Sequence, residues 1–194
     1  KIVALTEAVQ TNFSIMVYQG EEILHEQLFE LHIMPYDQWL GTSPMPQSLI
    51  SFVTPNHPTI NEVVIKAAAC LKELTGNSAF TAYQTGDPEK VTQQVAAIFA
   101  ALHQQGIVYR PAPPSFEVVG QRINLPEQVL TGKIGNCIEL TLLMAAVLEN
   151  VGINSVVILQ NTHAFLGVWL VDDYSPQSVS DDVSFLEKKC ATGI

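Results

Sequence analysis

A cysteine begins the most apolar helix that this sequence predicts, in the segment Gly135-Asn136-Cys137-Ile138-Glu139-Leu140. A thiol at a helix N-terminus lies at the positive end of the macrodipole, which favours the thiolate. A histidine follows in a strand-like run, Thr162-His163-Ala164-Phe165, and a nearby imidazole can complete the activation of a thiol. Cys137 and His163 therefore have the arrangement of a cysteine nucleophile and its base.

The helix after Cys137 is expected to lie at the centre of the fold. Its faces are almost all apolar, so it should pack against a sheet on one side and helices on another. The sheet is expected from residues 155–159 and 163–170, joined by a turn at Asn161-Thr162. This hairpin leaves His163 at the start of its strand, where it can meet the N-terminus of the cysteine helix.

Two further amphipathic helices are predicted upstream. Apolar residues recur at helical spacing over residues 60–74, with Thr59 as the expected N-cap and Gly76 as the stop. A second helix is expected from Asp87, as N-cap, to Gly106, with Pro88 at the first helical position. The two helices should pack against each other.

The chain changes character near residue 55. Before it, β-prone runs at residues 8–18, 23–34 and 49–53 predict a β-rich N-terminal module over residues 1–54. Gln27, Glu30 and His32 are expected to face solvent on a half-buried sheet. Residues 55–194 form the second predicted domain, and the whole chain is expected to be a fragment of a longer protein.

Composition limits the possible partners and cofactors. A net charge of -10 argues against direct binding of a nucleic-acid backbone, which needs clustered Lys and Arg. No apolar run is long enough for a membrane span, and the odd set Cys70, Cys137 and Cys190 suggests neither a disulfide framework nor a zinc site. No metal or nucleotide cofactor is implied, and a cytoplasmic protein is expected.

These motifs resemble the transglutaminase-like superfamily of papain-type folds. The resemblance covers roughly residues 85–171 and rests on Gly135-x-Cys137, the apolar helix that ends at Gly152-Ile153, and His163-Ala164-Phe165 followed by Val168-Trp169. More narrowly, segments 55–58, 120–123, 137–149 and 163–170 are similar to a bacterial family in which such a domain precedes a helicase-like ATPase. The chain is thus expected to be α+β, with a helix-start cysteine packed on an antiparallel sheet.

The resemblance implies Cys137 as nucleophile and His163 as general base. In such families the thiolate attacks a carbonyl and forms an acyl-enzyme, which water or an amine resolves. The Cys137 backbone N–H would contribute to an oxyanion hole, and Gln121 is a possible second donor. For Gln121, a structural role near the Gly120 turn is the stronger alternative.

The acid that would orient His163 is not identified. Asp172 and Asp173 follow on the same apparent strand, roughly 30 Å away at about 3.3 Å per residue. Asp181 or Asp182 is better explained as the cap of a helix over residues 183–189. The resemblance suggests another strand after Ile194, so one alternative places the third acid there.

Two functions stay open at this point. The first is a thiol enzyme, a cysteine hydrolase or acyltransferase that acts on a protein or peptide. The second is a catalytically inactive module that binds a peptide or another domain of the parent protein. Taken singly, Cys137 can be an inert helix-start cysteine and His163 a strand-end histidine bonded to backbone.

Overall fold

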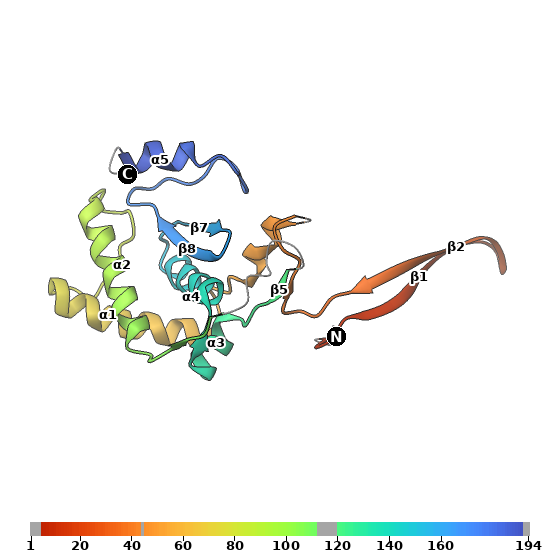
Figure 1. Ribbon diagram of the computed structural model, residues 1–194, viewed down its shortest axis with the longest axis horizontal. Helices are drawn as coiled ribbons and strands as arrows, with labels where there is room; N and C mark the ends of the chain where they lie inside the picture. Colours follow the sequence, from red (N-terminus) through yellow and green to blue (C-terminus); the bar gives the residue numbers. More distant parts are fainter. Residues whose placement is uncertain (1–4, 44, 112–119, 192–194) are drawn as a thin grey trace. The chain divides into compact units, whose positions relative to one another are not determined.

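The computed structural model describes residues 5–43, 45–111 and 120–191, which divide into two compact units, residues 1–38 and 39–194 (Figure 1). In the first unit, β1 (Val9–Gln19) pairs antiparallel with β2 (Glu22–Ile33). The connecting turn places Gly20 at a φ of 63°, a conformation that glycine adopts without strain. The first two predicted β-runs are therefore confirmed.

The prediction of a half-buried N-terminal sheet is wrong for this hairpin. Every residue of β1 and β2 is exposed, because these two strands pair only with each other. The cross-strand register also separates Gln27 from Glu30 and His32. Gln27 lies on the same face as Phe29, whereas Glu30 and His32 lie on the other.

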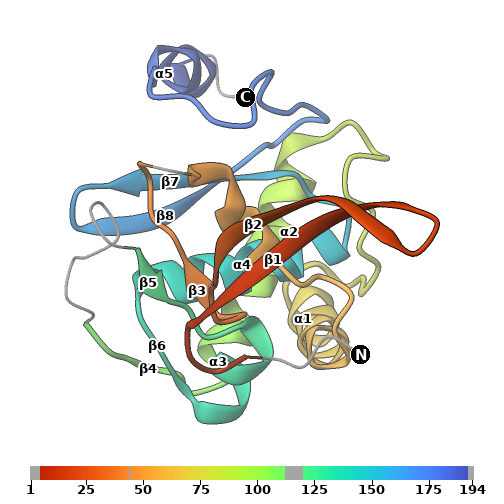
Figure 2. The same cartoon turned by 90° about the vertical axis from the view of Figure 1, so that its right-hand side faces the viewer.

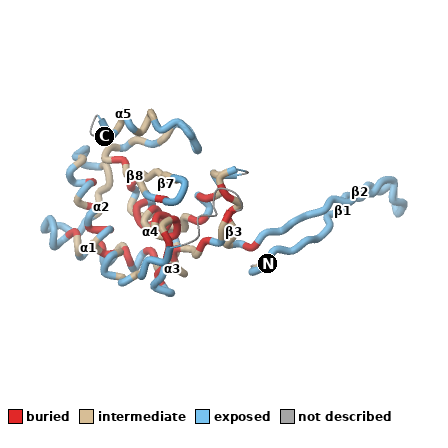
Figure 3. Tube along the Cα trace, in the orientation of Figure 1, coloured by how far each residue is buried: buried red, intermediate tan, exposed pale blue. Residues whose placement is uncertain are grey.

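The second unit is built around α4 (Cys137–Asn150). The hairpin of β7 (Ser155–Gln160) and β8 (His163–Val168) packs on one side of α4. Helices α1 (Pro58–Thr75), α2 (Pro88–His103) and α3 (Pro126–Gly132) pack around the rest (Figures 1 and 2). Figure 3 shows that α4 is the most continuously buried element. The central helix and its antiparallel hairpin confirm the predicted α+β core.

The upstream helices agree with the sequence pattern except at one cap. α1 (Pro58–Thr75) ends at Gly76, and α2 (Pro88–His103) begins after Asp87, whose Oδ1 accepts a hydrogen bond from the Glu89 N–H at 3.0 Å. The N-cap of α1 is His57 rather than the predicted Thr59, because Pro58 already occupies the first helical position.

A short 3₁₀ helix, η1 (Pro46–Phe52), replaces the third predicted β-run. That prediction is wrong because Leu49 and Phe52 lie three residues apart on one face of η1. Both are buried in a cluster with Trp39 and with Ile138 and Leu142 of α4. Residues 39–54 thus contribute to the core of the second unit, and the compact units divide after Gln38 rather than near residue 54.

The remaining elements are short. β3 (Gln38–Trp39) pairs with β5 (Gln121–Arg122), and β4 (Val108–Tyr109) pairs in parallel with β6 (Ile134–Gly135). α3 (Pro126–Gly132) precedes β6, and α5 (Ser184–Ala191) lies near the end of the chain. Within the described ranges, no helix is both long and apolar enough to cross a bilayer.

Candidate active site

The N-terminus of α4 is fixed by two reciprocal hydrogen bonds. Asn136 is the N-cap, and its Oδ1 accepts the Glu139 N–H at 3.0 Å. Glu139 Oε2 accepts the Asn136 N–H in return, at 2.8 Å. Cys137, the first residue of the helix, lies between the two residues of this capping box and is half-buried. The thiol is therefore held at a well-defined helix start.

Glu139 also ties this helix start to the segment after β5. Its carboxylate is only 1% exposed, and Oε1 accepts the Asn124 N–H at 2.9 Å. One buried carboxylate thus joins two backbone segments that are distant in sequence. Sequence reasoning treated Glu139 only as a polar exception on an apolar helix. The Asn-x-x-Glu spacing of a capping box was the signal that could have identified it.

Tyr109 lies beside Cys137, because β4 runs parallel to β6 just before α4 (Figure 2). Tyr109 is opposite Gly135, and the Arg110 N–H donates to the Gly135 carbonyl at 2.9 Å. Removal from water raises the pKa of Tyr109, and the charge of Cys137 and a side-chain hydrogen bond with Cys137 raise this pKa further. Sequence reasoning missed Tyr109, since pairing between two-residue strands leaves no periodic pattern.

His163 is brought to the same end of α4 by the packing of β8. The Thr141 hydroxyl, one turn after Cys137, lies 2.7 Å from the Cys137 carbonyl and 3.2 Å from the Ala164 carbonyl, within hydrogen-bonding distance of both. Ala164 is buried in the cluster against which Cys137 packs. His163 precedes Ala164, is exposed, and stacks on Phe165 with ring centroids 6.4 Å apart.

No hydrogen bond joins Cys137 to His163 among the residues that the structure describes. The shared location of the two residues therefore rests on the packing of β8 on α4, and their direct pairing stays a prediction.

The downstream aspartates lie away from His163. The β7–β8 register pairs Gln160 with His163 at one end of the hairpin and Ser155 with Val168 at the other. Asp173 belongs to the second end, where its carbonyl accepts from Asn154 Nδ2 at 3.0 Å. The Lys189 ammonium, 2.7 Å from Asp173 Oδ2, lowers the pKa of that carboxyl.

Asp182 is engaged at the start of α5. Its Oδ1 accepts the Ser184 N–H at 2.9 Å, and this bond lowers the pKa of Asp182. The prediction that Asp181 or Asp182 caps the last helix is confirmed for Asp182. Within residues 5–43, 45–111 and 120–191, no carboxylate forms a hydrogen bond or ion pair with His163.

Gln121 lies on β5, half-buried, and no hydrogen bond joins it to Cys137 in the described part of the chain. The preceding Gly120 has a φ of 67°, and a Cβ at this position would lie 2.0 Å from the Trp39 carbonyl oxygen. The backbone before Gln121 is thus constrained by close contact with the Trp39–Leu40 backbone. This close contact explains why a glycine occupies position 120. It gives the Gln121 side chain no specific role.

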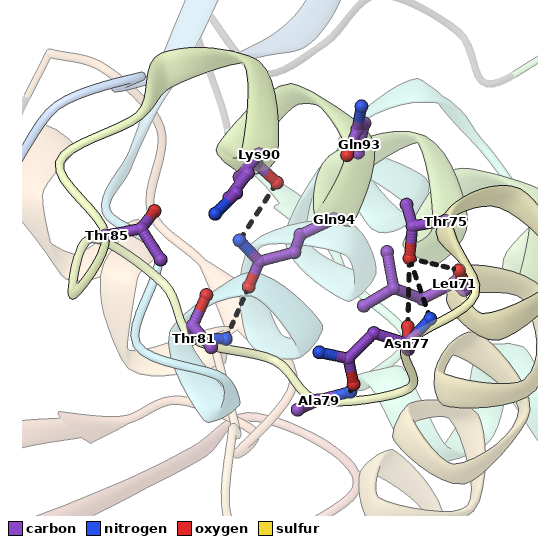
Figure 4. A pocket seen from close by; sticks show the side chains of 9 residues that line it. All are labelled: Leu71, Thr75, Asn77, Ala79, Thr81, Thr85, Lys90, Gln93 and Gln94. Atoms are coloured by element: carbon purple, nitrogen blue, oxygen red, sulfur yellow. Dashed lines mark hydrogen bonds between the residues drawn. The ribbon is translucent and has the colours of Figure 1, made fainter.

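A polar pocket of about 250 Å³ lies elsewhere in the unit, between the end of α1 and the start of α2 (Figure 4). Gln94, 2% exposed, closes its floor by accepting the Thr81 N–H at 2.8 Å and donating to the Lys90 carbonyl at 3.0 Å. None of its lining residues belongs to α4 or β8. This pocket is therefore separate from the Cys137 region.

The described ranges contain no cluster of His, Cys, Asp and Glu side chains that could hold a metal ion. The start of α4 offers the Cys137 thiol, with the Tyr109 phenol near it. These groups suit nucleophilic attack on a carbonyl and proton transfer.

Comparison with known proteins gives one match. Residues 78–177 match the family model described as the transglutaminase-like superfamily, and this span includes Tyr109, Gln121, Cys137 and His163. No curated protein and no solved structure matches the sequence.

Proposed function

Because the chain belongs to the transglutaminase-like superfamily, we propose that it performs thiol-dependent acyl chemistry on an amide of a protein or peptide. Cys137 acts as the nucleophile and His163 as the general base. The observation that carries this proposal is the position of Cys137 as the first residue of a buried, capped helix, on which the His163 strand packs. Family membership supports cysteine chemistry of this kind without naming a substrate.

In the proposed reaction, His163 takes the thiol proton and the Cys137 sulfur attacks the carbonyl carbon of the substrate amide. The C–N bond then breaks, and the leaving amine takes the proton back from the imidazolium. The product is a thioester on Cys137. Water releases a carboxylic acid from it in hydrolysis, and a second amine forms a new amide in transfer.

The negative charge that develops on the substrate oxygen needs donors near the sulfur. The Cys137 N–H is one, because the first N–H groups of a helix have no acceptor within the helix. Gln121 is the second donor suggested by the resemblance. Tyr109 is another candidate, because β4 pairs with β6 directly before Cys137 and places Tyr109 opposite Gly135.

A binding module is the second candidate function. It is favoured by the exposed His163 ring, which stacks on Phe165 and has no carboxylate partner within the described residues. Without an orienting acid the imidazole is free to turn, which lowers its efficiency as a base. In this case the region around Cys137 would bind a peptide or another domain of the parent protein without turnover.

The proposed setting is a cytoplasmic protein with a helicase-related ATPase elsewhere in its chain. The basis is the similarity of segments 55–58, 120–123, 137–149 and 163–170 to a bacterial family of that organisation. The acid that orients His163 would then come from sequence after Ile194. Thiol assays on a longer protein would test whether sequence after Ile194 supplies this acid.

Acyl-enzyme formation tests the proposal directly. The probe is p-nitrophenyl acetate, with intact-mass spectrometry of the protein. We expect an acetyl group on Cys137 and a burst of p-nitrophenol that is lost in Cys137→Ala and kept in Cys190→Ala, whose thiol is exposed but carries no motif. Labelling that is equal at the two cysteines would contradict an activated thiol and favour the binding module.

A further inference from the structure

The β1–β2 hairpin has one apolar face and one mixed face. The register aligns Val9 with Ile33, Phe13 with Phe29, and Val17 with His25 on the same side, so alternate residues of both strands share it. We define the apolar face by its large apolar side chains: Val9, Phe13, Ile15, Val17, Phe29, Leu31 and Ile33. Thr11, Gln27 and His25 complete it between Val9 and Val17, where it contains no Lys, Arg, Asp or Glu; beyond the bulge the pair Gln19–Glu22 ends this face.

The opposite face carries the charges of the two strands. Glu30 and His32 interact at 3.6 Å, and Gln10 donates a hydrogen bond to Glu30. Glu26 and Met16 are paired on this face, which also exposes Leu28. Glu26 and Glu30 therefore point away from the apolar face.

The apolar face is large for an unpartnered surface. Its seven apolar side chains are each 39–50% exposed, although they include two phenylalanines whose rings lie 6.4 Å apart. A two-stranded hairpin is only marginally stable in water, and a third strand or a second layer normally covers such a face. Covering the apolar face with a partner layer would therefore stabilise the hairpin.

We propose that the apolar face packs against the same face of a second copy of this chain. Five cross-strand pairs line the face between Val9 and Val17, and Phe13–Phe29 is the central pair. A two-fold axis that passes between the two copies at this pair therefore lets the same face of each copy cover the other. The two ribbons would form a two-layer sheet packing with the phenylalanines at its centre.

Charge and area favour a second copy as the occupant. The chain carries a net charge of -10, which opposes self-association unless the contact surface lacks acids, as the five cross-strand pairs between Val9 and Val17 do. The seven side chains expose roughly 500 Å² per copy, so two copies would bury about 1,000 Å², which reaches the lower limit for a specific interface.

Sedimentation velocity over a range of micromolar concentrations tests this proposal. We expect a dimer for the unmodified chain and a monomer for Phe13→Lys, with a dissociation constant raised at least tenfold. The matched control is Met16→Lys, three residues away on the opposite face, which should remain dimeric. A chain that is monomeric throughout, or a Met16→Lys variant that dissociates as much as Phe13→Lys, would overturn the proposal.

A cross-linking measurement keeps the test valid if Phe13→Lys disturbs the hairpin itself. In a chain with Cys70→Ala, Cys137→Ala and Cys190→Ala, Phe13→Cys should be joined between copies by a short bismaleimide, because the two copies of this residue face each other across packed sheets about 10 Å apart, too far for a direct disulfide. Met16→Cys in the same background should not. Equal cross-linking at both positions, or none at either, would contradict the face-to-face dimer.

Discussion

The Thr141 hydroxyl on α4 lies within hydrogen-bonding distance, 3.2 Å, of the Ala164 carbonyl on β8. This contact joins the helix that begins with Cys137 to the strand that begins with His163. The same hydroxyl lies 2.7 Å from the Cys137 carbonyl, so one buried side chain links both halves of the proposed pair. The relation between the starts of α4 and β8 therefore depends on the core rather than on a surface loop.

Replacing Thr141 should loosen this junction. Thr141→Val keeps the shape but leaves the Ala164 carbonyl without that donor, so we expect a loss of about 1–2 kcal/mol in the free energy of unfolding, measured by urea denaturation. Thr92→Val is the matched control, because its hydroxyl bonds only to the Pro88 carbonyl of its own helix, at 3.0 Å. A similar loss in both variants would contradict a tertiary role for Thr141.

Glu139 should be essential to the helix start. Glu139→Gln substitutes an amide that can accept only at its oxygen, leaving either the Asn136 or the Asn124 N–H unpaired. We expect a loss of about 1–3 kcal/mol in the free energy of unfolding. Glu149→Gln, at an exposed position on the same helix, should be nearly neutral. Equal stability of the two variants would show that the buried hydrogen bonds contribute little.

The ionisation of Tyr109 should report on Cys137. Desolvation raises the pKa of Tyr109, and the charge and hydrogen bond of Cys137 raise it further. Cys137→Ala should therefore lower this pKa, but the increase caused by desolvation should remain. Ultraviolet titration, in which the Tyr109 signal is identified by its loss in Tyr109→Phe, measures the shift. Cys70→Ala is the control and should leave the titration unchanged. An unchanged Tyr109 titration in Cys137→Ala would place the phenol away from the thiol.

Tyr83 should make the fold sensitive to alkali. Its hydroxyl donates to the Trp169 carbonyl at 2.9 Å and accepts the Asn154 N–H at 2.8 Å, and burial raises its pKa. As the pH rises above about 10, the unfolded chain loses the phenol proton before the folded chain does, so the free energy of unfolding falls until the pH passes the folded pKa.

Tyr83→Phe tests this dependence through urea denaturation at several pH values. The variant should be less stable at neutral pH, because two backbone groups lose their partner, but its stability should fall less between neutral and alkaline pH. Tyr174→Phe, at an exposed residue, is the control and should keep the alkaline loss. A Tyr83→Phe variant with the same alkaline loss as the unmodified chain would rule out Tyr83 as its source.

Regular periodicity made the core predictable from sequence. The apolar helix from Cys137, the strand that starts with His163 and the Asp87 cap all follow from spacing along one element. The run at 49–53 was misassigned because a short apolar segment fits a strand or a helical turn equally well. Tyr109 and the burial of Glu139 depend on contacts between segments far apart in sequence, which spacing along one element does not reveal.

The rate of Cys137 alkylation tests the central claim most directly. Iodoacetamide is added to a chain with Cys70→Ala and Cys190→Ala, so that a single thiol reacts, and the rate is followed across pH in folded and urea-unfolded protein. The account predicts faster alkylation at neutral pH in the folded chain, and a fall to the unfolded rate or below in His163→Ala. A folded rate no higher than the unfolded rate, or one unaffected by His163→Ala, would contradict an activated Cys137–His163 pair.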